Sequence, residues 1–258
     1  MGKPNVRETA DGIPLIDLHV HVEEGLSLAR ALELSTERGI AFGIVEHAGR
    51  GEQIDGDGAL QRYMASLEAY PVYKGVQAEG LAWFKQFSPE MVARLDYVLS
   101  DALTFPDADG TLVRLWTPRA VFPDAQDFME RYVAFNVQVM AEEPIDILAN
   151  PTFLPPYLND QYDALWTPER MRKVITAAVE YGVAIELNAR YQIPSLTFIR
   201  KAKDAGVVFS FGSNYHGEDV GRLDYCLYAV QECGLTRQHL FMPRPAGAKP
   251  IERRAQHA

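Results

Sequence analysis

The stretch IDLHVH, residues 16–21, carries two histidines, His19 and His21, at the end of a short apolar run. Alternate residues of a strand point to the same side, so the two imidazoles would share one face. Apolar runs of this kind recur along the chain and alternate with longer segments of helical spacing, as in βα units around a parallel sheet. The runs cover residues 14–18, 41–45, 72–77, 96–99, 145–149, 183–187 and 207–211.

The segments between these runs carry helix signals. Thr167 followed by Pro168 is a typical pair of N-cap and first-turn residues. Gly182 and Gly206 stand where helices should end. Apolar residues recur at helical spacing over residues 26–38, 124–142, 168–181 and 195–205.

No linker, repeat or low-complexity tract divides the chain, so we expect a single α/β domain over residues 1–258. The longest irregular piece, residues 104–123, is rich in Pro, Asp and Gly and is a candidate lid. The polar tail, residues 249–258, is expected to be frayed, which makes His257 uninformative.

Composition limits the class of protein. The 258 residues are 47% hydrophobic and 23% charged, which excludes disordered, collagen-like and coiled-coil proteins. Lys and Arg total 25 against 35 Asp and Glu, and the net charge of −10 opposes broad binding to nucleic acid or to an anionic membrane. No apolar run of signal-peptide or membrane-spanning length occurs, so we expect a cytoplasmic protein.

Polar side chains follow the strands at their carboxyl ends, where barrel enzymes carry their chemistry. Histidines two residues apart on a strand have the spacing of metal ligands, and Glu79 at the end of a buried strand needs a cation. The alternatives are strand histidines satisfied by hydrogen bonds, an exposed loop carboxylate at Glu79 and a turn role for Asp101. After the first strand, the polar residues are Glu46, His47, Glu79, Asp101, Asn150, Asn188, Arg190, Asn214 and His216.

The motifs IDLHVH, EH, AEG, NP, IELN and GSNYH follow one another in the order of a known family. Together they resemble the polymerase and histidinol phosphatase (PHP) superfamily of metal-dependent phosphoesterases over most of the chain. The resemblance implies a distorted seven-stranded (β/α)7 TIM-like barrel whose strand ends hold up to three divalent ions. It also implies hydrolysis of a phosphate ester.

Carried over by position, the resemblance implies three groups of metal ligands. The first is His19, His21, Glu79 and Asn214, the second is the oxygen-only group Glu79, Asp101 and Asn150, and the third is the remnant His47 and His216. Catalysis would rest on His19, His21, Glu79, Asp101 and His216. Two further family histidines fall near Ser27 and at Leu103. We therefore expect one or two divalent ions, with Mn²⁺, Mg²⁺, Zn²⁺ and Fe²⁺ as candidates, and the oxygen ligands favour Mg²⁺ or Mn²⁺.

The predicted chemistry is attack of a metal-activated water on a small phosphomonoester. Arg50 and Arg190 are placed to bind phosphate oxygens, because a guanidinium binds them bidentately; the alternative is a solvated loop charge. Arg114 and Arg119 are further candidates. The predicted partner is a small phosphorylated substrate, neither nucleic acid nor membrane is expected, and the oligomeric state does not follow from the sequence.

Two alternative hypotheses remain. The substituted ligand positions suit a catalytically impaired barrel that binds a metal or a phosphorylated metabolite without turnover. The amidohydrolase superfamily also opens its barrel with His-x-His, but it needs histidines after the middle strands, and none lies between His47 and His216. The sequence has no P-loop, nucleophile elbow or dinucleotide-binding motif, which excludes the enzymes that depend on them.

Overall fold

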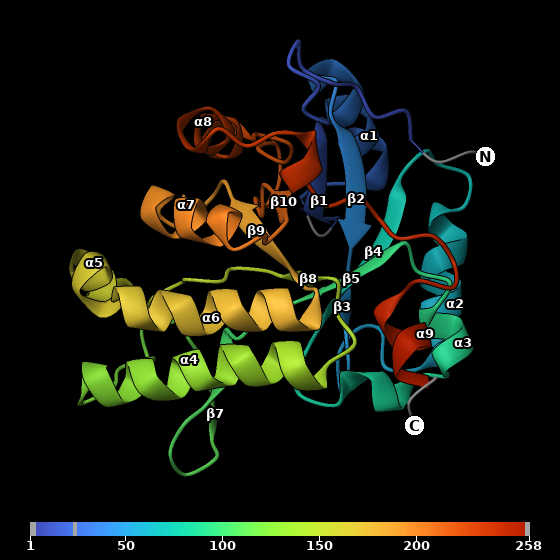
Figure 1. The fold of residues 1–258 in the computed structure, drawn as a ribbon. Coiled ribbons are helices and arrows are strands. Elements are labelled where there is room, and N and C mark those ends of the chain that lie inside the picture. Colours follow the sequence, from blue (N-terminus) through green and yellow to red (C-terminus); the bar gives the residue numbers. More distant parts are fainter. Residues whose placement is uncertain (1–3, 23–24, 256–258) are drawn as a thin grey trace.

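The computed structural model describes residues 4–22 and 25–255, and within them parallel strands form a barrel with helices on its outside (Figure 1). Neighbouring strands pair in the order β1-β2-β4-β5-β8-β9-β10, and the short β3 also pairs with β4. The strands are β1 Ile16–His21, β2 Ala41–Val45, β3 His47–Ala48, β4 Tyr73–Ala78, β5 Tyr97–Ser100, β8 Ile147–Leu148, β9 Ala184–Asn188 and β10 Phe209–Gly212. The seven predicted strands and the predicted barrel class are confirmed.

The first and last strands come together at the mouth of the barrel. Just beyond β10, the backbone N–H of Asn214 donates to the carbonyl of His19 over 3.1 Å. Residues from the two ends of the chain therefore meet at one site.

Helices cover the barrel, and α4 and α6 lie side by side along one flank (Figure 1). Thr167 caps α6 by accepting from the N–H of Arg170, and Gly182, with φ of 65°, ends it as predicted. None of the helices in the described residues is long and apolar enough to cross a membrane. The α-helices are α1 Leu28–Arg38, α2 Asp57–Leu67, α3 Pro89–Val92, α4 Ala125–Glu142, α5 Tyr162–Leu165, α6 Pro168–Tyr181, α7 Leu196–Asp204, α8 Asp224–Cys233 and α9 Pro250–Ala255. The 3₁₀ helices are η1 Trp83–Gln86, η2 Pro156–Gln161 and η3 Arg237–His239.

A β-bulge in β1 decides which of its side chains face the barrel interior. Between Asp17 and Val20, two residues of β1, Leu18 and His19, lie opposite one residue of β2. Leu18 packs in the apolar cluster inside the barrel, whereas Val20 packs outside against the helices. The extra residue lets His19 and His21 face inward as well.

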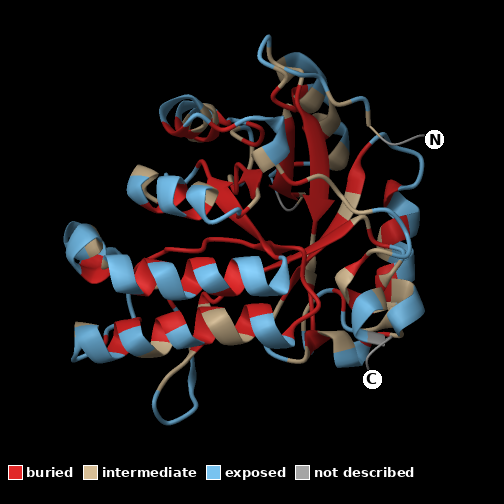
Figure 2. Cartoon of the chain, viewed as in Figure 1, coloured by how far each residue is buried: buried red, intermediate tan, exposed pale blue. Residues whose placement is uncertain are grey.

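An apolar layer fills the barrel below its polar mouth. The Tyr97 ring lies so close to Gly75 that a Cβ there would overlap it, and its hydroxyl donates to the carbonyl of Leu18 over 2.8 Å. Gln77 and Glu79 follow Gly75 at alternate positions, so they face the same interior one level higher. The strands are buried and the outer faces of the helices exposed, as Figure 2 shows.

Residues 104–123 are not wholly irregular. They contain an antiparallel hairpin of β6 Thr104–Pro106 and β7 Leu112–Arg114, which projects beyond α4 (Figure 1). Its cross-strand hydrogen bonds explain why a stretch rich in turn residues still has regular structure.

The tail also differs from the expectation of a frayed segment. Helix α9 occupies residues 250–255, and Ile251 is buried. The ammonium of Lys249, which is 8% exposed, donates to the carbonyls of Ala93 and Leu95. A polar composition predicted fraying, but this lysine finds buried acceptors in the α3–β5 region. His257 lies outside the described residues.

Candidate functional site

A cavity of about 250 Å³ opens at the carboxyl ends of the strands. The predicted site residues line it, except for His19, which lies buried beneath it, and Arg50, which lies outside it. The lining side chains are His21, His47, Gln77, Glu79, Asp101, Leu103, Trp116, Asn150, Arg190, Tyr191, Asn214 and His216. Residues from every part of the barrel thus converge on one space.

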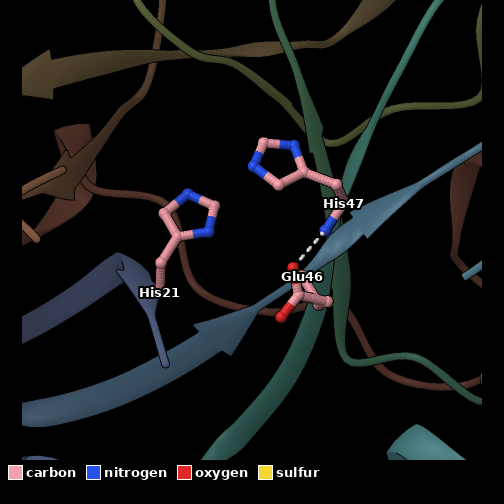
Figure 3. A group of neighbouring side chains, drawn as sticks. All are labelled: His21, Glu46 and His47. Carbon is pink, nitrogen blue, oxygen red and sulfur yellow. Dashed lines mark hydrogen bonds between the residues drawn. The ribbon is translucent and has the colours of Figure 1, made fainter. Parts of the chain in front are cut away.

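One side of the site is the histidine cluster, which consists of the cavity-lining His21, His47 and His216 together with the neighbouring Glu46. The His21 ring stacks on that of His47, with centroids 5.0 Å apart, and on that of His216, with centroids 5.5 Å apart. Single ligand atoms of His21, Glu46 and His47 all lie within 4.8 Å of one another. His21 comes from the end of β1, and the other two come from the junction of β2 and β3 (Figure 3). The cluster therefore gathers nitrogen and oxygen donors that one cation can reach.

The pKa values of the two central histidines of the cluster shift in opposite directions. Burial, followed by repulsion from neighbouring histidines, lowers the pKa of His21 well below its ordinary value. A neutral imidazole keeps the lone pair that a metal needs. Burial alone would lower the pKa of His47, but the hydrogen bond and charge of Glu79 raise it overall. Nδ1 of His47 lies 2.8 Å from Oε1 of Glu79, the carboxylate contact that usually orients a metal-binding imidazole.

His19 lies beneath the cluster and uses both ring nitrogens. Its Nδ1 lies 2.5 Å from Oε1 of Glu186, and its Nε2 lies 3.0 Å from Oε1 of Gln77. Burial alone would lower the pKa of His19, but the buried carboxylate of Glu186 raises it above its ordinary value. The same pairing lowers the pKa of Glu186 despite burial. Both ring nitrogens of His19 therefore face oxygen acceptors, and the raised pKa favours the protonated ring. A Cβ at position 212 would overlap the Glu186 carboxylate, so only Gly212 fits there.

The other side of the site is the amide network, which meets the histidine cluster at Glu79 and consists of Gln77, Glu79, Asp101, Asn150, Asn188 and Asn214. Nε2 of Gln77 donates to Glu79 over 3.1 Å and to Asp101 over 3.4 Å. Burial, followed by the charge of Glu79, raises the pKa of Asp101 to about 7. A carboxyl group with this pKa can both give and take a proton near neutral pH.

Three asparagines complete the amide network. Asn188 and Asn214 both donate to Oδ1 of Asn150, over 2.9 and 3.0 Å. Nδ2 of Asn150 in turn donates to Asp101 over 2.9 Å. Asn150 and Asn214 each have φ of 48°, in the left-handed region that asparagine tolerates better than most residues. These two residues thus hold the turns after β8 and β10, and their amides hydrogen-bond within the network.

The two arginines predicted to bind phosphate lie in different places. Arg190 lines the cavity, where its guanidinium donates to the carbonyl of Asn214 over 3.2 Å and lies 5.3 Å from the centre of the Tyr191 ring. Arg50 lines a second, adjoining cavity. One guanidinium therefore lines the same cavity as the histidine cluster, and the other lines the adjoining cavity.

Ser27 and Leu103, which stand at two histidine positions of the family, have other roles here. The Ser27 hydroxyl accepts from the N–H of Arg30 and caps α1. Leu103 is buried and lines the cavity as an apolar wall. Neither side chain can replace an imidazole ligand.

Two residues that hydrogen-bond to His19 are missing from the sequence prediction, as are the cavity-lining Trp116 and Tyr191. Gln77 stands two residues before Glu79, so the strand alternation that pairs His19 with His21 applies to it as well. Glu186 is a charge inside the buried run AIELN and needs a buried partner. Both signals are present in the sequence, but their partner, His19, lies 58 and 167 residues away along the chain.

Comparison with known proteins agrees with this architecture. No family model matches the chain. Two curated probable phosphatases, from a Thermoanaerobacter species and from Thermoanaerobacter pseudethanolicus, are each 29% identical to it over 122 residues. The match spans 44% of this chain and 45% of each relative, so it covers less than half of their length.

Among solved structures, the histidinol phosphate phosphatase of Lactococcus lactis, in complex with zinc, L-histidinol and phosphate, is similar in fold. The TM-score is 0.63 with 11% sequence identity, and the match covers 88% of this chain and 98% of that one. The two chains therefore share an α/β barrel fold, which agrees with the barrel predicted from the sequence.

Proposed function

We propose that this protein is a metal-dependent phosphoesterase that releases phosphate from a small phosphomonoester. The observation that carries the proposal is the convergence of a metal-binding donor set and a guanidinium, that of Arg190, on one cavity at the mouth of the barrel. Imidazole and carboxylate donors bind divalent ions, and a guanidinium binds phosphate oxygens. The phosphatases that resemble the chain in sequence and in fold support the same reaction class.

The histidine cluster fits one divalent ion. His21, Glu46 and His47 would hold it, with His216 stacked on His21, and this ligand set of two imidazoles and one carboxylate would leave room for a water or substrate oxygen. Imidazole donors favour Zn²⁺, Mn²⁺ or Fe²⁺ over Mg²⁺. The bound ion supplies Lewis acidity and a water nucleophile at neutral pH. The amide network fits a second ion poorly, because the amide of Gln77 already donates to its two carboxylates.

The residues of the chain orient the substrate and the ligands. Arg190 binds the phosphoryl oxygens, and its contacts with Asn214 and Tyr191 hold the guanidinium in place before binding. Glu79 orients the ring of His47 through Nδ1. His19, fixed between two acceptors, supports the floor of the cavity.

A second candidate function is binding of a phosphorylated ligand without turnover. The observation in its favour is the Gln77 amide between His19 and the two carboxylates, because a neutral side chain there weakens cation binding on that side. Such a protein would keep Arg190 and the histidine cluster but release no phosphate.

Metal analysis of the purified full-length chain, followed by phosphatase assays with and without added Mn²⁺ or Zn²⁺, tests the proposal. We expect one tightly bound ion per chain and metal-dependent phosphate release. His21→Ala removes a ligand and lowers kcat/KM by more than about 100-fold, since even the loss of a group that only orients a ligand costs about 10–100-fold. His239→Ala is the matched control, because His239 caps η3 outside the cavity.

Two results would contradict the proposed phosphoesterase. The first is undiminished phosphate release after complete chelation. The second is a His21→Ala variant that keeps both the ion and the activity. Metal and phosphate binding without release from any ester in a broad panel would instead favour the second candidate function.

A further inference from the structure

A second cavity, of about 790 Å³, adjoins the first, and His47, Glu79 and Trp116 line both. Its outer wall includes residues of the β6–β7 hairpin, the segment that projects beyond α4 (Figure 1). The larger cavity therefore continues directly from the one that contains the histidine cluster.

The hairpin side of this cavity exposes large apolar side chains. Trp116 is 44% exposed and Leu112 is 64% exposed, whereas Trp83 and Trp166 are buried. The guanidinium of Arg114 lies 5.9 Å from the centre of the Trp116 ring. An exposed indole with a cation over it forms a flat surface that suits a planar ring with negative charge at its edge.

Two cations, Arg50 and Arg114, line the same cavity. Both are exposed, and within residues 4–22 and 25–255 neither guanidinium has a carboxylate partner. The carboxylates that line the cavity are Glu52 and Glu79, and Glu79 already accepts from His47 and Gln77. In a chain of net charge −10, unpaired guanidinium groups that face a cavity mark a local site for an anion.

We propose that the second cavity binds the leaving group of the substrate, and that this group carries a planar ring and a second anionic group. The inference rests on the proposed function, since it takes the phosphate to lie beside Arg190 in the first cavity. The ring stacks on Trp116, and the second anion pairs with Arg50 and Arg114. The division of the arginines between two cavities then follows from one substrate with negative charge at both ends.

The kinetic test uses phenyl phosphate and 4-carboxyphenyl phosphate with the full chain. The wild type prefers the carboxylated ester by about tenfold in kcat/KM, the factor that corresponds to about 1.4 kcal/mol. The double variant Arg50→Gln and Arg114→Gln loses this preference, and Trp116→Ala lowers kcat/KM for both esters. Comparing the ratio of the two esters between variants cancels the difference in their leaving-group acidity. Arg119→Gln, which is exposed in the same segment but does not line the cavity, keeps the preference.

A binding test is independent of turnover. Trp116 is the exposed tryptophan, so 4-carboxybenzylphosphonate should quench intrinsic fluorescence, and the double arginine variant should weaken its Kd by about tenfold. Benzylphosphonate, which has no carboxylate, should bind equally to both proteins.

The outcomes separate the two proposals. Equal hydrolysis of both esters by wild type and double variant overturns the leaving-group assignment and leaves the phosphoesterase proposal standing. No hydrolysis of any ester, together with the expected binding preference, overturns the phosphoesterase proposal and leaves the cavity as a binding site for such anions. Equal binding of both phosphonates to both proteins overturns the assignment directly.

Discussion

The two sides of the cavity differ in how their polar atoms are used. In the histidine cluster, burial and the imidazole neighbours lower the pKa of His21 well below its ordinary value, and its ring stacks on those of His47 and His216. In the amide network, the side chains of Gln77 and Asn150 donate to nearby carboxylates. On the second side the amides are engaged in hydrogen bonds, whereas on the first side single ligand atoms of His21, Glu46 and His47 lie within 4.8 Å of one another.

This difference shows what an amide does at a strand end that faces a polar cavity. A carboxylate there repels its neighbours until a cation binds, whereas an amide can donate to one neighbour and accept from another. Gln77 does both, because it accepts from His19 and donates to Glu79 and Asp101. The side with amides is therefore stable without an ion, and the side with imidazoles is the one suited to bind it.

The largest expected effect comes from breaking the support under the amide network. Glu186→Gln removes the buried carboxylate that raises the pKa of His19, and removing one partner of a buried pair costs about 3–5 kcal/mol. We expect this loss in the free energy of unfolding, measured by urea denaturation. Glu218→Gln is the control, since its ion pair with Arg30 is exposed and is worth about 0–1 kcal/mol. Equal losses in the two variants would show that the His19–Glu186 pair has no special role.

A smaller change would make the two sides alike. Gln77→Glu places a third carboxylate beside Glu79 and Asp101, and we expect the number of Mn²⁺ ions bound per chain at saturation to rise from one to two. Isothermal titration calorimetry measures this stoichiometry. Gln86→Glu adds the same charge at an exposed position outside the cavity and should leave it unchanged. A Gln77→Glu protein that still binds one ion would mean that the amide is not what limits cation binding.

The smallest effect is expected at the edge between the two sides. Asn214→Asp adds one negative charge to the cavity, and we expect the Kd for Mn²⁺ to fall by about fivefold, a Coulombic gain of about 1 kcal/mol. The aspartate cannot donate to Asn150 as the Asn214 amide does, so the free energy of unfolding without metal should fall slightly. Asn159→Asp, at an exposed position, is the control for the change in net charge. An unchanged Kd in Asn214→Asp would place residue 214 outside the reach of the ion.

The strands and most of the cavity could be predicted because their signals are local. Apolar runs of strand length, helix caps such as Thr167 and polar residues at strand ends all lie within a few residues of the elements they define. The parallel order then brings every strand end to one mouth, so residues as distant as His21 and His216 could be expected together before any contact was known.

The partners of these residues could not be predicted in the same way. Leu103 and Ser27 stand where the resembled pattern has histidines, and only their packing and capping contacts assign them a role. The tail was expected to fray because its residues are polar, yet the Lys249 ammonium reaches carbonyls more than 150 residues away along the chain. Such contacts depend on which surfaces the fold brings together.

By itself, the sequence determined the barrel class, the strand ends and the residue types at its mouth, because alternation and apolar runs are properties of the local chain. Only the tertiary structure decided how those residues are partnered. The bulge between Asp17 and Val20 turns His19 inward, where Glu186 and Gln77 occupy both its ring nitrogens. His21 instead faces His47 and His216. Two histidines of one motif thus have different environments, because burial and charge depend on neighbours that are distant in sequence.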